Sequence, residues 1–169
     1  MPADPAYVDT SVLGAYYCPE PLSSAAEAAL LKVQEPCISA LTEVEFASLI
    51  ARKRRLRELS EREASEVLRL FGQHVAEGYY RRLPLGAEHL LRARDLIASM
   101  ASALSTLDAL HLSVALSAEL PLLTADRDFA RAARRHAPVQ RQQALPALQA
   151  LHRLRPLDDL AEKVGEELG

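Results

Sequence analysis

Short apolar runs alternate along the chain with longer segments whose apolar residues recur at helical spacing. The apolar runs predict strands, and Leu120–Thr124 is the clearest buried one. The expected strands cover residues 6–9, 37–39, 79–85, 120–124 and 138–140. The expected helices cover residues 10–18, 22–34, 40–56, 60–76, 87–101, 105–119 and 126–135. Strands that alternate with helices predict a three-layer α/β/α sandwich around a central parallel sheet.

These elements place residues 1–140 in one domain, and a chain of 169 residues is long enough to bury a core of that size. Residues 141–169 are interrupted by proline and end in acidic residues, which predicts a helical C-terminal extension. In the segment 40–56, Leu41, Val44 and Leu49 lie near one helical face, which we expect to be the buried one. Glu43 should face solvent, because it lies two residues from Glu45 and points in another direction.

Composition narrows the functional class. Apolar residues make up 49% and charged residues 25% of the chain, as in ordinary soluble globular proteins. No 18-residue window is uncharged and apolar, and the N-terminus lacks the features of a signal peptide, so we expect a cytoplasmic protein that does not contact membranes. Cys18 and Cys37 lack zinc-site spacing to histidine, which argues against zinc or thiol chemistry. With a net charge of −3, any nucleic-acid contact must come from a local basic patch.

Acidic residues follow several of the predicted strands. Asp9 ends the first strand, and Asp126 follows Leu120–Thr124. Glu45 lies in the helix after strand 37–39, and Asp108 lies at the start of helix 105–119. Ligands of open parallel sheets gather where the strands end, so these four side chains are candidates for one site.

Each acid also has a purely structural interpretation. Asp9 and Asp126 stand where helix N-caps are expected, and an aspartate there accepts hydrogen bonds from free N–H groups. Thr42-x-x-Glu45 and Ser105-x-x-Asp108 both match the spacing of a capping box. If the acids instead converge, their mutual repulsion requires a cation. A ligand set of oxygens without histidine or cysteine favours Mg²⁺ or Mn²⁺.

The motifs "YVDTSVL", "ISALTEVEFASL", "LSTLDALHLSVAL" and "LLTADRDFARAA" resemble, in this order, the four acidic motifs of PIN-domain nucleases. Their spacing is similar to that of VapC-type toxins of type II toxin–antitoxin pairs, over about residues 6–140. The resemblance implies a PIN-like α/β/α fold, a divalent-metal site, endoribonuclease activity, a small antitoxin that blocks the groove, and a homodimer. Carried over by position, the metal-binding and catalytic acids are Asp9, Glu45, Asp108 and Asp126. Auxiliary roles fall to Asp128 and to the hydroxyls of Thr10, Ser11 and Thr124.

The expected reaction is hydrolysis of an RNA phosphodiester bond by a water that the bound metal activates. Phosphate contacts would come from basic side chains on two helices. The candidates are Arg52, Lys53, Arg54 and Arg55 at the end of helix 40–56, and Arg127 directly after Asp126.

Two other functional classes stay open. A metal-dependent phosphohydrolase could use Asp9 as a nucleophile, although Ser11 stands where the haloacid-dehalogenase pattern has a second aspartate. A non-catalytic PIN-like module could instead regulate a partner by binding alone. A dinucleotide-binding fold is not indicated, because "DTSVLG" after the first strand is not GxGxxG.

Overall fold

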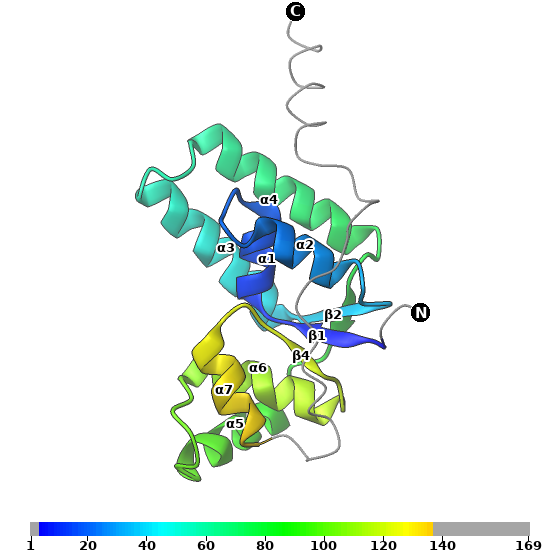
Figure 1. Cartoon of the computed structure of the whole chain (residues 1–169), viewed down its shortest axis with the longest axis vertical. Coiled ribbons are helices and arrows are strands. Elements are labelled where there is room, and N and C mark those ends of the chain that lie inside the picture. The colour runs from blue at the N-terminus through cyan, green and yellow to red at the C-terminus, as the bar shows by residue number, and fades with distance from the viewer. Residues whose placement is uncertain (1–3, 137–169) are drawn as a thin grey trace, which may run out of the picture.

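A four-stranded parallel sheet lies at the centre of the computed structural model, which describes residues 4–136 (Figure 1). The strand order is β3-β2-β1-β4, so β1 is flanked on both sides. The strands are β1 (Ala6–Val8), β2 (Pro36–Ser39), β3 (Arg81–Leu83) and β4 (Leu122–Leu123). All four predicted strands in the described range are present; β1, β3 and β4 are shorter than expected, whereas β2 is one residue longer.

Helices cover both faces of the sheet, which confirms the predicted three-layer α/β/α sandwich (Figure 1). One face is covered by α1 (Thr10–Tyr17), α2 (Ser23–Leu30), α3 (Ala40–Arg55) and α4 (Glu61–Ala76). The other face is covered by α5 (Ala87–Ala98), α6 (Thr106–Ser117) and α7 (Arg127–Arg134). The carboxyl ends of β1 and β2 lead directly into α1 and α3, so both helices begin at the same edge of the sheet.

Alternation along β1 divides its side chains between two cores. Ala6 and Val8 belong to the larger core, which α1, α3 and α4 line. Tyr7 points to the opposite face and packs with Val114 and Ala115 of α6. Successive residues of a strand face opposite sides of the sheet, so this one residue is directed toward the α5–α7 layer.

The position of Asp9 is set by backbone pairing with β4. Tyr7 N–H donates to the carbonyl of Pro121 and Asp9 N–H to that of Leu123, each at 2.9 Å. The first residue after β1 therefore lies beside the end of β4. On the other side, α1 approaches α3 closely at Gly14, where even an alanine Cβ would lie 2.6 Å from Leu49 Cδ2.

The predicted buried face of α3 is only partly correct. Leu41 and Leu49 are half-buried, but Val44 is 68% exposed, whereas Thr42, Phe46 and Ile50 are buried. Phe46 packs against the rings of Tyr17 and Phe71, so α1 and α4 determine which side of α3 is covered. Apolar residues occur all round this helix, and periodicity alone therefore could not select the correct side.

Glu43 is partly exposed, and its two carboxylate oxygens accept hydrogen bonds from Arg82 at 2.8 Å each. This ion pair joins α3 to the edge strand β3. Charged side chains such as Arg81 and Arg82 on β3 also discourage pairing with another chain at this edge.

Two expectations concern residues outside the described range: the strand at 138–140 and the helical extension at 141–169. Within residues 4–136, none of the helices combines the length and the apolar character needed to cross a bilayer.

Phe46→Ala is expected to lower the free energy of unfolding by about 3–5 kcal/mol, because it opens a cavity among three packed rings. Val44→Ala, two residues earlier on the exposed side of the same helix, should change it by less than about 0.5 kcal/mol. Urea unfolding of both variants checks this. Equal effects of the two substitutions would contradict the observed orientation of α3.

Candidate metal centre

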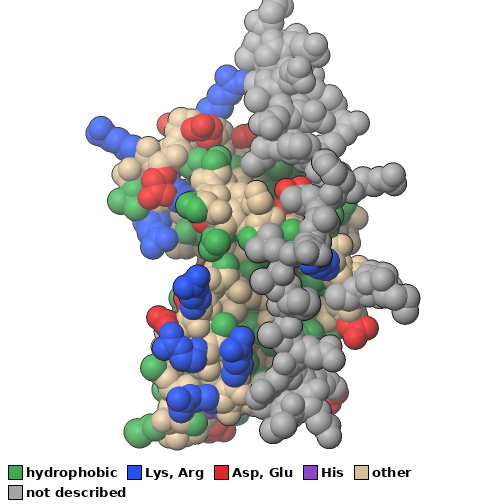
Figure 2. Space-filling view, viewed as in Figure 1, with side chains coloured by type: hydrophobic (Ala, Val, Ile, Leu, Met, Phe, Trp, Pro, Cys, Tyr) green, Lys and Arg blue, Asp and Glu red, His purple; other side chains and the backbone are tan. Residues whose placement is uncertain are grey.

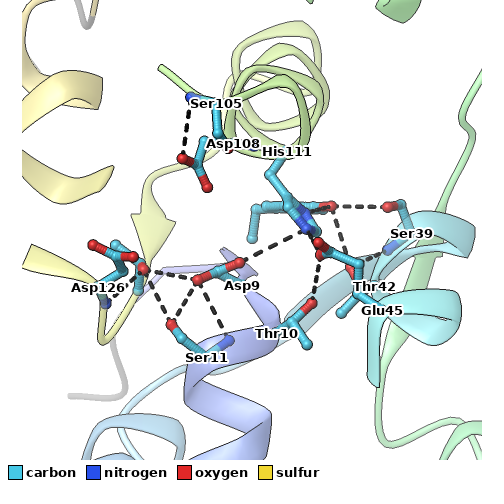
Figure 3. Close-up of polar contacts among 12 residues, drawn as sticks. Asp9, Thr10, Ser11, Ser39, Thr42, Glu45, Ser105, Asp108, His111 and Asp126 are labelled. Carbon is cyan, nitrogen blue, oxygen red and sulfur yellow. Dashed lines mark hydrogen bonds and ion pairs between the residues drawn. The ribbon is translucent and has the colours of Figure 1, made fainter. Parts of the chain in front are cut away.

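Asp9 lies at the N-cap of α1, and its two carboxylate oxygens have different surroundings (Figure 3). Oδ2 accepts hydrogen bonds from the hydroxyls of Ser11 at 2.6 Å and Thr124 at 2.8 Å, and from Ser11 N–H at 3.4 Å. Oδ1 faces His111, with Nε2 at 3.7 Å. The hydroxyls thus fix the rotation of the carboxylate and leave one oxygen directed into the centre.

Glu45 reaches the same point from the second turn of α3. Its Oε2 accepts a hydrogen bond from the Thr10 hydroxyl at 2.9 Å and also lies in close contact with His111 Nε2. Burial by itself raises the pKa of Glu45, but the hydrogen bond and charge of His111, with the Thr10 hydroxyl, hold this pKa below its ordinary value. The site therefore keeps Glu45 ionised.

His111 comes from α6 and is almost fully buried, with 1% of the residue exposed. Its Nδ1 lies 2.8 Å from the hydroxyl of Tyr7. That hydroxyl in turn lies 2.8 Å from Ser39 Oγ and 3.2 Å from Thr42 Oγ1. Burial raises the pKa of Tyr7 to about 12, so the phenol stays protonated at neutral pH.

Asp9, Glu45 and His111 together form a group suited to a metal ion, because each offers one ligand atom and these three atoms lie within 4.8 Å of one another. Two carboxylates and an imidazole are a common donor set for divalent cations. The sequence prediction of an all-oxygen ligand set missed His111. The available signal was its place three residues after Asp108 in "LDALHL", which puts both on one side of α6.

Asp108 and Asp126 lie at the ends of helices near this group (Figure 3). Asp108 is half-buried and forms a capping box with Ser105: Ser105 N–H donates to Asp108 Oδ2 at 3.3 Å, and Asp108 N–H donates to Ser105 Oγ at 3.2 Å. Asp126 is exposed and caps α7, its Oδ1 accepting N–H groups from Asp128 and Phe129. Neither belongs to the three-residue group.

The capping interpretation is confirmed for Asp9, Asp126 and the Ser105–Asp108 pair. It is wrong for Thr42 and Glu45, because the box on α3 pairs Ser39 with Thr42 one turn earlier, which leaves Glu45 free to face the centre. Capping and convergence are therefore not exclusive, since Asp9 does both.

Thr124 and Ser11 connect the N-terminus of α1, where Asp9 lies, with the N-terminus of α7, where Asp126 lies. Thr124 Oγ1 accepts a hydrogen bond from Asp126 N–H at 3.0 Å while its hydroxyl contacts Asp9. Ser11 Oγ accepts one from Ala125 N–H at 2.9 Å. Asp128, the other auxiliary acid, is exposed and paired with Arg131 at 2.6 Å, away from these contacts.

Residues 6–135 match the model of a family described as the PIN domain. The chain belongs to the PIN domain family. No curated protein matches this chain.

Two solved structures are similar to this chain. Their sequence identity to it is low, so the similarity shows a shared fold and nothing more. The first is Mycobacterium tuberculosis VapC20, described as a sarcin-ricin loop cleaving toxin, with 18% identity and a TM-score of 0.60. The match covers 77% of this chain and 95% of VapC20. The second is FitAcB from Neisseria gonorrhoeae, with 18% identity, a TM-score of 0.58, and coverage of 76% and 93% respectively.

In the view of Figure 2, basic side chains of this PIN domain lie over both halves of the molecule, and several lie close together over the half that contains α5, α6 and α7. Arg127 is exposed at the start of α7, next to Asp126. Arg52, Arg54 and Arg55 are also exposed, but they lie about 10–15 Å along α3 from Glu45 at 1.5 Å per residue. Lys53 has 12% of its side chain exposed and forms ion pairs with Glu20 and Glu58, so it is a poor candidate for a phosphate contact.

Glu45→Gln should reduce the pH dependence of stability on the acid side, measured by urea unfolding in EDTA. The folded pKa of Glu45 is lowered from 4.5, so its ionised form stabilises the fold above that value. This contribution is lost as the pH falls through the folded pKa. The difference between wild type and variant should therefore be largest near neutral pH and shrink below 4.5; a difference that stays constant would contradict the assignment.

Proposed function

We propose that this chain is a metal-dependent endoribonuclease of the VapC toxin type. The observation that carries the proposal is the convergence of Asp9 and Glu45, from two different helices, on one buried point with His111. Membership of the PIN domain family and the likeness to VapC20 and FitAcB support a nuclease that acts as a toxin. The donor set fits the metal that such a reaction requires.

We assign each candidate site residue a role according to its position. Asp9 and Glu45 would hold the metal, and we assign Asp108 and Asp126 to the same metal site. Ser11 and Thr124 fix the rotation of Asp9, and Thr10 does the same for Glu45. Asp128 holds Arg131 on α7. A bound Mg²⁺ or Mn²⁺ supplies Lewis acidity and charge stabilisation for hydrolysis of the phosphodiester.

The similarity to VapC20 and FitAcB also supports a proposal for the substrate and the protein partner of this chain. VapC20 is described as cleaving the sarcin-ricin loop, and we infer a structured RNA as the substrate class here. A small antitoxin, a homodimeric state and a cytoplasmic location are likewise part of the proposal. Few aromatic residues are available for stacking on bases, since they make up 5% of the chain, so the shape of the RNA should carry specificity.

Asp9→Asn is expected to lower the rate of RNA cleavage by at least ~10²-fold, because it removes a carboxylate that holds the metal. The matched control is Asp95→Asn, since Asp95 is exposed and pairs with Arg94 on α5. The measurement is cleavage of a structured RNA by purified protein with Mg²⁺ or Mn²⁺ and with EDTA. Near-normal cleavage by Asp9→Asn would refute the proposal.

The same assay separates the other functional classes. Hydrolysis of a small phosphate ester without RNA cleavage would favour a phosphohydrolase. Inertness toward both substrates, with intact binding of a protein partner, would favour a regulatory module. EDTA-sensitive RNA cleavage supports the nuclease.

Arg127→Gln should weaken RNA binding and lower the slope of log K against log salt by about 0.7–0.9, as expected when one phosphate contact is lost. Binding is measured by titration in EDTA over a range of salt. Arg94→Gln is the matched control, because that guanidinium is engaged by Asp95 at 2.7 Å. An unchanged slope for Arg127→Gln would remove this residue from the RNA surface.

A further inference from the structure

The two ring nitrogens of His111 have different roles in the site. Nδ1 lies against the hydroxyl of Tyr7, deep between β1 and α6. Nε2 faces Glu45 and Asp9 (Figure 3). Because the imidazole is 1% exposed and held at Nδ1, it cannot turn away to solvent without breaking that contact.

The hydroxyl chain behind His111 is compatible with a lone pair on Nε2. If Nδ1–H donates to Tyr7, the phenol can donate onward to Ser39 Oγ at 2.8 Å or Thr42 Oγ1 at 3.2 Å. In this structure Nε2 is the hydrogen-bond partner of Glu45 Oε2, and a metal ion bound at Nε2 would take the place of the proton between them. Histidines that bind metals commonly have the second nitrogen fixed by such a hydrogen bond, which sets the tautomer and the ring orientation.

We propose that His111 Nε2 is a direct metal ligand beside Asp9 and Glu45, and that this nitrogen makes the site prefer a first-row transition dication such as Mn²⁺ over Mg²⁺. The inference deepens the proposed function and rests on it for the identity of the site. Mg²⁺ requires oxygen ligands in near-ideal octahedral geometry, whereas an imidazole nitrogen suits transition metals. Asp9 and Glu45 alone would not distinguish the two classes in this way.

Pulsed EPR of bound Mn²⁺ tests the inference directly, because a coordinated imidazole gives a ¹⁴N coupling to the metal. Tag-free protein is used, so that no added histidine contributes. We expect the coupling in the wild type and in His136→Gln, a control on a histidine that instead contacts Ser102. It should disappear in His111→Gln. Bound Mn²⁺ without nitrogen coupling, or a coupling that persists in His111→Gln, would overturn the inference.

Metal affinity provides the second readout. His111→Gln should weaken Mn²⁺ binding by at least ~10-fold while Mg²⁺ binding changes little, so that the preference for Mn²⁺ is lost. Tyr7→Phe, which removes the hydroxyl behind the ring, should weaken Mn²⁺ binding by about 10-fold. Equal losses for both metals in His111→Gln would overturn the preference.

The outcomes separate this inference from the proposed function. RNA cleavage by a Mn²⁺-loaded protein without nitrogen coupling leaves the nuclease in place and overturns the ligand assignment. Nitrogen coupling in a protein that cleaves no RNA supports the ligand assignment and refutes the nuclease. Failure of the wild type to bind Mn²⁺ overturns the ligand assignment, and RNA cleavage with Mg²⁺ then decides the nuclease.

Discussion

Two carboxylates, Asp9 and Glu45, meet beneath the surface at the carboxyl edge of a parallel sheet, and the arrangement around them follows from their charge. Like charges at this separation repel, and partial burial removes the water that would screen them. Positive character must come from a neighbouring side chain or from a bound cation. His111 Nε2 lies between them, and the hydroxyls of Thr10, Ser11 and Thr124 take the remaining hydrogen bonds.

Three separate features of the fold bring Asp9, Glu45 and His111 together. Pairing of β1 with β4 fixes the place of Asp9, and the close crossing at Gly14 brings α3 beside α1. Alternation along β1 sends Tyr7 to the opposite face, where its hydroxyl holds an imidazole from α6. The centre thus joins both helical layers through the sheet. A change in any layer is expected to alter the positions of Asp9, Glu45 and His111.

The sequence predicted the features that local pattern controls. Strand ends followed by acids placed Asp9 correctly, and Ser105-x-x-Asp108 identified a real capping box. It did not name His111, whose only local signal is its place three residues after Asp108 on the same side of α6. It also did not predict that Val44 is exposed and Thr42 buried on α3. Thr42 is buried there because Tyr7, 35 residues away, supplies a partner for its hydroxyl.

Anomalous diffraction from a crystal grown with Mn²⁺ would show whether Asp9, Glu45 and His111 surround one cation. We expect a peak bounded by the carboxylates of Asp9 and Glu45 and by His111 Nε2. A peak held by other residues, with His111 still hydrogen-bonded to Glu45, would contradict this expectation.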